Sequence, residues 1–242
     1  GLNRVLPSEW LDAVVPIGER TPSGFSPRGI GVVMRVGEMS WLVTAGHVVS
    51  GAPPLVGVVQ SPDRDAVGEI VLGAPGQIAW VVNQALDIAV HPFTHEGETS
   101  VKVIAESELA HLAELRPSAP AYSIGVPMGL AGLDPSRPTP FVLGGIVSAV
   151  SARSNEVYST AVALPACSGS PLVARREDGS WALAGLLLSL VGFQQTGPAT
   201  QLFFGVARSA EVIGQALAHM RLGPPAMPPR GDGTPPDRSN LN

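Results

Sequence analysis

Short apolar segments separated by glycine- and proline-containing turns run through the first 206 residues, and no other feature constrains the fold as strongly. Long helical periodicity is absent from this part of the sequence. The apolar segments are rich in β-branched residues: Ile30–Val36, Trp41–Thr44, Ala66–Leu72, Ile78–Val82, Ile88–Val90, Ala121–Gly125, Ile146–Val150, Glu156–Val162, Pro171–Ala174 and Trp181–Leu190. Many short strands with turn signals between them predict an all-β protein, either a barrel or a sandwich.

The pattern changes after Arg208, where a helix is predicted. Ser209 is a suitable N-cap, and Gly223 and Pro224 end the helix. One apolar stripe follows the cap: Val212, Ile213, Ala216, Leu217 and Met220. Two further short helices are expected, an opening one over 8–13 and a connector over 107–115. Residues 222–242 contain six prolines and three glycines, so we expect an extended tail or a linker to another module.

Charge and composition exclude several classes of function. A net charge of −5, without a cluster of basic and aromatic residues, argues against nucleic-acid binding. The longest apolar run, residues 182–193, is too short to span a bilayer. No metal-ligand spacing and no phosphate-binding loop is seen, so no cofactor is expected. One cysteine allows no intramolecular disulfide, which favours a cytoplasmic location. Export stays open, because the chain begins with Gly1.

A tight turn of small residues, "ALPACSGSPLV" at 163–173, presents a candidate nucleophile. Ser168 is followed by Gly169, Ser170 and Pro171, and Cys167 lies directly before it. A serine hydroxyl needs a nearby base, usually histidine, and that base needs a carboxylate to orient it. A serine in such a sequence is also a common turn residue, so the turn alone does not establish catalysis.

His47 and Asp87 are the candidate base and carboxylate. His47 ends "WLVTAGH", an apolar strand followed by two small residues, and Asp87 is a lone carboxylate in the apolar segment "ALDIAV". Each has a structural alternative, because a lone histidine is often a packing residue and an aspartate can cap a turn. The joint occurrence of His47, Asp87 and Ser168 at strand ends favours catalysis.

Five motifs, in order along the chain, resemble those of trypsin-like serine proteases of the chymotrypsin fold. "WLVTAGHVV" resembles the family's histidine segment, "LDIAV" its aspartate segment and "ACSGSP" its serine segment. "AYSIGVPMGL" and "GGIVSAV" resemble segments of the compact bacterial branch, the HtrA-type and glutamyl-endopeptidase-like enzymes. The similarity extends over about residues 25 to 215.

This resemblance implies two six-stranded Greek-key β-barrels with a C-terminal helix and the active site between the barrels. A lead-in segment at 1–24 would precede the first barrel at 25–116, which would carry His47 and Asp87. The second barrel with the helix, at 117–221, would carry Ser168, and 222–242 would be the tail. The implied activity is cleavage of protein or peptide substrates through an acyl-enzyme.

The family pattern also assigns the oxyanion hole and distinguishes Ser168 from Cys167. The nucleophile of the family lies directly before glycine, which is the position of Ser168. Cys167 is one residue early and should point away from His47. The oxyanion hole would use the backbone N–H groups of Ala166 and Ser168. The family normally has glycine where this chain has Ala166, so weak or conditional activity is expected.

The substrate pocket implied by the family consists of small or apolar residues. These are Val162, Leu188, Ser189, Leu190 and Gly205. An apolar pocket favours a small or medium apolar residue before the cleaved bond. Residues 188–190 should pair with the substrate backbone as an added strand. Two other functions stay open, namely an inactive peptide-binding module and a hydrolase that uses Cys167.

Overall fold

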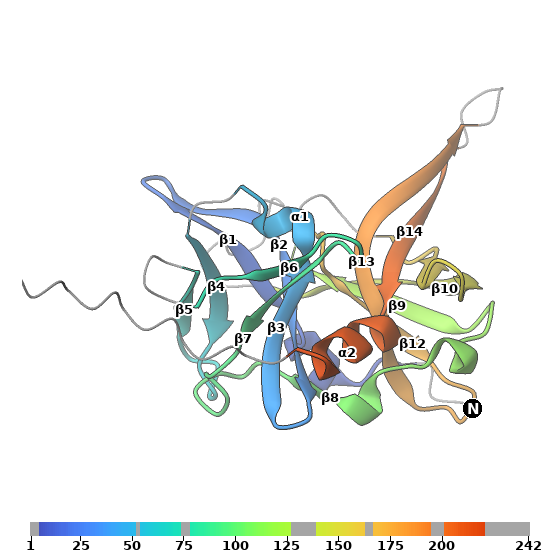
Figure 1. Ribbon diagram of the computed structural model, residues 1–242, viewed down its shortest axis with the longest axis horizontal. Helices are drawn as coiled ribbons and strands as arrows, with labels where there is room; N and C mark the ends of the chain where they lie inside the picture. Colours follow the sequence, from blue (N-terminus) through green and yellow to red (C-terminus); the bar gives the residue numbers. More distant parts are fainter. Residues whose placement is uncertain are drawn as a thin grey trace, which may run out of the picture.

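The computed structural model describes residues 5–51, 54–73, 78–126, 139–162, 167–194 and 201–220. Its strands fall into two halves that lie side by side, one built from the blue-to-green strands and the other from the green-to-orange ones (Figure 1). In the described residues, no helix is both long and apolar enough to cross a membrane.

The first half is a single sheet of eight strands. They are β1 (Val15–Thr21), β2 (Gly24–Val36), β3 (Met39–Ala45), β4 (Leu55–Gln60), β5 (Val67–Leu72), β6 (Val81–Asn83), β7 (Ile88–Pro92) and β8 (Val103–Ala105). The strand order is β5-β4-β1-β2-β3-β7-β6, and β8 pairs in parallel with β2. The long strand β2 is therefore the centre of this half, because it pairs with β1, β3 and β8.

The first half differs from the prediction, which was of two closed six-stranded barrels. Within the described residues no ladder joins β5 to β6, so the sheet stays open between its two end strands. The end strands are poorly suited to closing it, because β6 has only three residues and β5 leaves most of its residues exposed. The segment expected as a lead-in also contains β1, which pairs with both β2 and β4.

The second half is a closed barrel of six strands, as the family resemblance implies. They are β9 (Pro120–Gly125), β10 (Phe141–Ser151), β11 (Glu156–Ser159), β12 (Pro171–Arg175), β13 (Trp181–Gln194) and β14 (Gln201–Ser209). The order around the barrel is β10-β11-β14-β13-β12-β9, closed by pairing of β9 with β10. Strands β13 and β14 continue as a two-stranded arm that projects well beyond the rest of the barrel (Figure 1).

The helices are few and short. They are η1 (Ser8–Asp12), α1 (Gly46–Val49), η2 (Glu106–Glu108), η3 (Leu112–Glu114) and α2 (Ala210–Ala218). The predicted closing helix is confirmed, and the Ser209 hydroxyl accepts a hydrogen bond from the N–H of Val212. The predicted connector helix at 107–115 is instead two 3-10 turns. The carbonyls of Ser107 and Leu109 accept hydrogen bonds from Arg176, so they are not used in a continuous helix.

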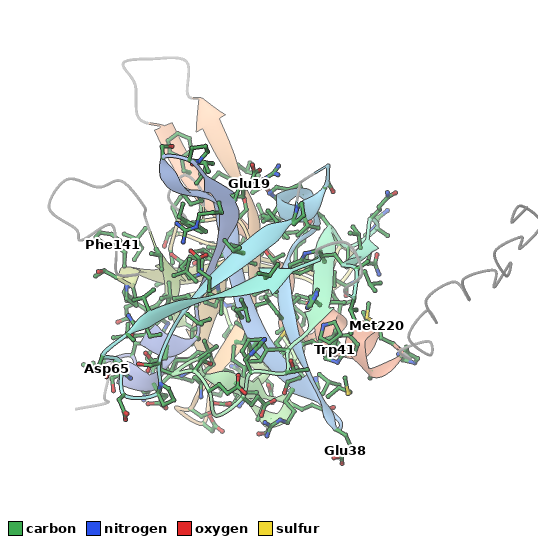
Figure 2. All side chains as sticks on the ribbon, turned by 90° about the vertical axis from the view of Figure 1, so that its left-hand side faces the viewer. Glu19, Glu38, Trp41, Asp65, Phe141 and Met220 are labelled. Carbon is green, nitrogen blue, oxygen red and sulfur yellow. The ribbon has the colours of Figure 1, made fainter. Side chains whose placement is uncertain are left out.

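The core consists of three apolar clusters, and one of them joins the two halves. One fills the first half, a second fills the barrel, and the third combines side chains of both halves with helix α2. In the shared cluster, Ile30 and Val43 of the first half join Leu183 of the barrel and Ile213 of α2. Trp41 belongs to the same cluster, and Met220, two residues beyond the end of α2, packs against this cluster (Figure 2). Because the shared cluster is buried, the two halves pack as one unit.

Candidate active site

A hydrogen-bonded pair of His47 and Asp87 lies at the end of the first half's central strands. His47 is in α1, directly after β3, and Asp87 directly precedes β7, which pairs with β3. The imidazole Nδ1 is 2.8 Å from Asp87 Oδ2, and the N–H of His47 donates to Asp87 Oδ1 at 3.0 Å. Their side chains are 48% and 39% exposed, so the pair is open to solvent on one side.

The pairing determines which imidazole nitrogen carries the proton. An ionised carboxylate has lone pairs and no hydrogen, so it only accepts hydrogen bonds. Asp87 therefore requires the proton of neutral His47 on Nδ1, which leaves Nε2 as the basic nitrogen. This is the orientation that a general base needs toward a serine hydroxyl.

The backbone around Asp87 is held in an unusual conformation. Asp87 has a φ of 51°, in the left-handed region that residues other than glycine seldom adopt, although asparagine and aspartate adopt it more readily than most. Its carbonyl accepts a hydrogen bond from the N–H of Gly46 at 2.8 Å, and its own N–H donates to Gln84. The Asn83 side chain accepts from the N–H of Leu86 at 3.1 Å. These bonds stabilise the turn that directs the carboxylate at His47. Asn83 was not among the site residues predicted from the sequence, although an asparagine at a turn is a known local signal.

The serine turn belongs to the barrel, but its backbone is bonded to the first half. The carbonyl of Ser168 accepts a hydrogen bond from the N–H of Ile30 in β2 at 2.8 Å. The N–H of Gly169 donates to the carbonyl of Leu187 in β13 at 2.7 Å. Gly169 has a φ of 88°, and a Cβ there would be 2.1 Å from the Ile30 carbonyl oxygen. Only glycine fits this approach of the two backbones.

The docked turn lies close to the strand that leads into His47. The same Cβ position on Gly169 is 3.2 Å from the backbone nitrogen of Ala45, two residues before the histidine. The structure therefore brings the turn of Ser168 to the end of β3, where the His47–Asp87 pair lies. In the part of the chain that is described, no hydrogen bond joins Ser168 Oγ to His47. Hydrogen bonds of this kind are often formed only when substrate binds.

Cys167 and Ser168 lie in different environments. Cys167 is 2% exposed, and a Cβ on Gly125 would be 2.6 Å from its sulfur, so the thiol faces the barrel strand β9. Ser168 is partly exposed. The next serine, Ser170, is buried, and its N–H donates to the carbonyl of Cys167 at 2.9 Å. The thiol is therefore buried against the barrel, whereas the Ser168 side chain is partly exposed.

The predicted pocket residues are brought together only in part. Leu190 and Gly205 are direct partners in the pairing of β13 with β14, and Leu190 is 46% exposed. Leu188 interrupts that pairing as a bulge and packs against the core of the first half. The carbonyl of Val162 accepts a weak hydrogen bond from the Ser123 hydroxyl at 3.4 Å. Ala166, assigned to the oxyanion hole, and the tail at 222–242 lie outside the described residues.

A cavity of about 280 Å³ lies away from these residues. Its lining includes Asp12, Gln60, Arg64 and Thr139, and it contains none of the predicted site residues. Asp12 and Arg64 are paired with each other, so this cavity offers no unpaired charge. Across the described ranges, no group of three or more His, Cys, Asp or Glu residues is arranged to hold a metal ion.

Local hydrogen bonds shift the pKa of two groups in the barrel, Asp178 and Tyr158. The hydroxyl and N–H of Ser180 donate to Asp178 and hold the pKa of its carboxyl below the ordinary value. The hydrogen bond from Tyr158 to Glu156 raises the pKa of the Tyr158 phenol. Both groups belong to the barrel, at the β12–β13 turn and on β11.

Comparisons with known proteins agree with this architecture. Residues 29–185 match the sequence profile of a family described as "Trypsin-like peptidase domain". The fold is similar to the apo MamO protease domain from Magnetospirillum magneticum, with a TM-score of 0.56 and 20% identity over 89% of this chain and 100% of that one. It is also similar to a serine endoprotease from Yersinia pestis, with a TM-score of 0.56 and 20% identity over 88% of this chain and 66% of the other. No curated protein matches the sequence.

Proposed function

Because the chain belongs to the trypsin-like peptidase family, we propose that it is a serine endopeptidase with Ser168 as nucleophile, His47 as general base and Asp87 as the orienting carboxylate. Membership of this family of hydrolases implies protein substrates. The observation that carries the proposal is the 2.8 Å pairing of His47 Nδ1 with Asp87, formed where the turn of Ser168 docks onto β2.

In the proposed reaction, Ser168 Oγ attacks the carbonyl carbon of the peptide bond. Nε2 of His47 takes the hydroxyl proton and then gives it to the leaving amine, which forms the acyl-enzyme. A water molecule, activated by the same nitrogen, then attacks the acyl group and restores Ser168. Asp87 stabilises the imidazolium that exists between these proton transfers. The N–H groups of Ser168 and Ala166 would bind the oxyanion.

We propose that the enzyme prefers a small or medium apolar residue before the cleaved bond. The residues assigned to the pocket, among them Val162, Leu188 and Gly205, carry no charge that would select Lys, Arg or Glu. Apolar contacts discriminate modestly, about 10- to 200-fold between side chains that differ by a methylene group. The exposed Leu190 lies where the substrate backbone would pair with β13.

A fluorophosphonate probe tests the nucleophile directly, because it reacts with an activated serine. We expect labelling of the wild type and of Cys167→Ser at Ser168, identified by peptide mass spectrometry, and no labelling of Ser168→Ala. Labelling that survives in Ser168→Ala, or a wild type that stays unlabelled while folded, would refute the assignment.

A second candidate function is peptide binding without turnover. It is favoured by the lack of a hydrogen bond between Ser168 Oγ and His47 in the described residues. The same labelling experiment distinguishes the two, when it is combined with a binding measurement on an unlabelled peptide. An inactive module would bind peptide with the wild type and Ser168→Ala alike, and neither would react with the probe.

A further inference from the structure

Arg208 of the barrel reaches across to the residue directly before Asp87. It lies on β14, and its Nε donates to the carbonyl of Leu86 at 3.0 Å. The two residues are 122 positions apart in the sequence. The side chain of Arg208 is only 14% exposed, so this bond is largely shielded from water.

The other end of the guanidinium is anchored within the barrel. Nη1 donates to the carbonyl of Ser154 at 2.6 Å and lies 3.7 Å from a carboxylate oxygen of Glu156. Glu156 is paired with Arg208 across β11 and β14, and it also accepts a hydrogen bond from Tyr158. The planar guanidinium is thus held on one side by the barrel and presents Nε to the first half.

The bond to Leu86 acts on the peptide plane that determines the direction of Asp87. The carbonyl of Leu86 and the N–H of Asp87 belong to one planar peptide group. Arg208 bonds one edge of this plane, and Gln84 accepts from the N–H on the other edge. The next peptide group is held through the bond of the Asp87 carbonyl to Gly46. With both planes held, the φ of 51° at Asp87 has little freedom to relax.

We propose that Arg208 is a positioning residue that holds the Asp87 turn so that the carboxylate faces His47. The inference rests on the proposed function, since it assigns Arg208 a role in the same triad. It also makes the triad depend on the barrel twice, through the turn of Ser168 and through Arg208. Arg208 does not touch the reacting atoms and acts only through Asp87.

The kinetic test compares Arg208→Ala and Arg208→Lys with the wild type on one peptide substrate. We expect kcat to fall on the order of 10²-fold in Arg208→Ala with little change in KM, because misplacing a catalytic group by about 1 Å has such an effect. Arg208→Lys keeps the charge but cannot bond Leu86 and Ser154 in the same planar arrangement, so it should restore activity only in part. In an Asp87→Ala background, Arg208→Ala should cause no further loss of kcat.

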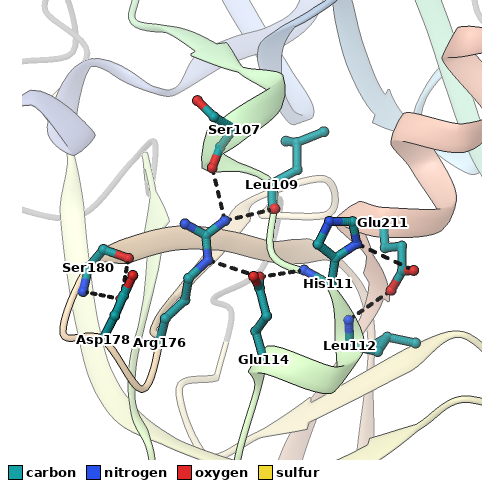
Figure 3. A network of polar contacts seen from close by, with 9 residues as sticks. All are labelled: Ser107, Leu109, His111, Leu112, Glu114, Arg176, Asp178, Ser180 and Glu211. Carbon is teal, nitrogen blue, oxygen red and sulfur yellow. Dashed lines mark hydrogen bonds and ion pairs between the residues drawn. The ribbon is translucent and has the colours of Figure 1, made fainter.

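Arg176 provides a matched control, because it makes the same kind of contact far from Asp87. It is 15% exposed, and its guanidinium donates to the carbonyls of Ser107 and Leu109 and pairs with Glu114 (Figure 3). Arg176→Ala should lower the melting temperature about as much as Arg208→Ala but leave kcat unchanged. Equal losses of kcat in the two variants would overturn the proposal, because the effect would then be one of general stability.

Crystal structures of the wild type and of Arg208→Ala separate this inference from the proposed function. We expect the Leu86–Asp87 peptide to turn in the variant and Asp87 to leave hydrogen-bonding distance of His47 Nδ1. An unchanged turn in Arg208→Ala would overturn the positioning role, whatever the fluorophosphonate result. A changed turn in a protein that the probe does not label would support the positioning role while the proposed function fails.

Discussion

The two halves of the molecule contribute to the candidate site in different ways. The first half, an open sheet, forms the His47–Asp87 pair from adjacent strands and from hydrogen bonds within a short stretch of backbone. The second half, a closed barrel, carries Ser168 on a turn whose carbonyl is bonded to Ile30 of the first half. Both residues of the candidate base therefore come from the first half, although Arg208 of the barrel contacts their turn, whereas the candidate nucleophile comes from the barrel and its position depends on how the halves pack.

This difference explains where sensitivity to mutation should be concentrated. Substitutions within the His–Asp turn act on the base alone. Substitutions at the docked serine turn act on the packing of the halves as well as on chemistry, because Gly169 contacts the backbone of Ile30. Substitutions on the far surface of the barrel should affect neither.

The largest expected effect is the loss of turnover in Ser168→Ala. Triad residues act as a unit, so kcat should fall roughly 10⁴- to 10⁶-fold, and Ser168→Ala/His47→Ala should be no worse. The measurement is kcat on a peptide with Leu before the cleaved bond, with melting temperature as the check on folding. Activity within tenfold of the wild type in the folded single variant would show that the two halves do not combine into one triad.

Gly169→Ala should damage both stability and activity, because it affects the contact between the halves. A left-handed φ costs a residue with a side chain about 1–3 kcal/mol, and the new Cβ also clashes with the Ile30 carbonyl. Gly179→Ala is the matched control. Gly179 has a φ of 90°, but its Cβ would meet only the flexible side chain of Arg175.

The two glycine variants should differ both in the free energy of unfolding, measured with denaturant, and in kcat. We expect Gly169→Ala to be the less stable of the two and to lose activity, and Gly179→Ala to lose stability alone. Equal free energies of unfolding would mean that docking of the serine turn adds nothing to the backbone strain.

Cys167→Ser should have a smaller effect, confined to stability. The side chain is 2% exposed, and removing the more polar hydroxyl from water should lower the free energy of unfolding by about 1 kcal/mol. Most of kcat should remain, since the thiol faces Gly125. Abolished turnover in a folded Cys167→Ser protein would make Cys167 the nucleophile.

The smallest expected effect is a pH-dependent one at Asp178, on the surface of the barrel. Its folded pKa lies below the ordinary value of 3.8, because Ser180 donates to the carboxylate. The stabilisation is therefore complete above that value and is lost as the pH falls through the folded pKa. Asp178→Asn should remove this dependence from the melting temperature below about pH 4. Its kcat near neutral pH should equal that of the wild type, and a change would show that this turn is coupled to the site.

Local sequence predicted the candidate triad, which stays a prediction, and most of the strands that the structure shows. His47, Asp87 and Ser168 each lie beside an apolar segment, and such segments pair as strands whose ends place the side chains. Ser209 and its apolar stripe likewise predict helix α2 without reference to the rest of the chain. Strand β1 was not predicted because Pro16 and Gly18 interrupt its pattern, and β8 because three residues carry too little periodicity. Strands β4 and β14 were also absent from the predicted segments.

Contacts between residues far apart in the chain were decided only by the tertiary structure. The bond from Ile30 to Ser168 and the bond from Arg208 to Leu86 each join segments that no local pattern relates. The sequence likewise did not show that the first sheet stays open between β5 and β6. Hydrophobic periodicity specifies which face of a strand is buried, but not which distant backbone group that strand will meet. Those partners follow from the packing of the two halves around their shared apolar cluster, in which residues from both ends of the chain are buried together.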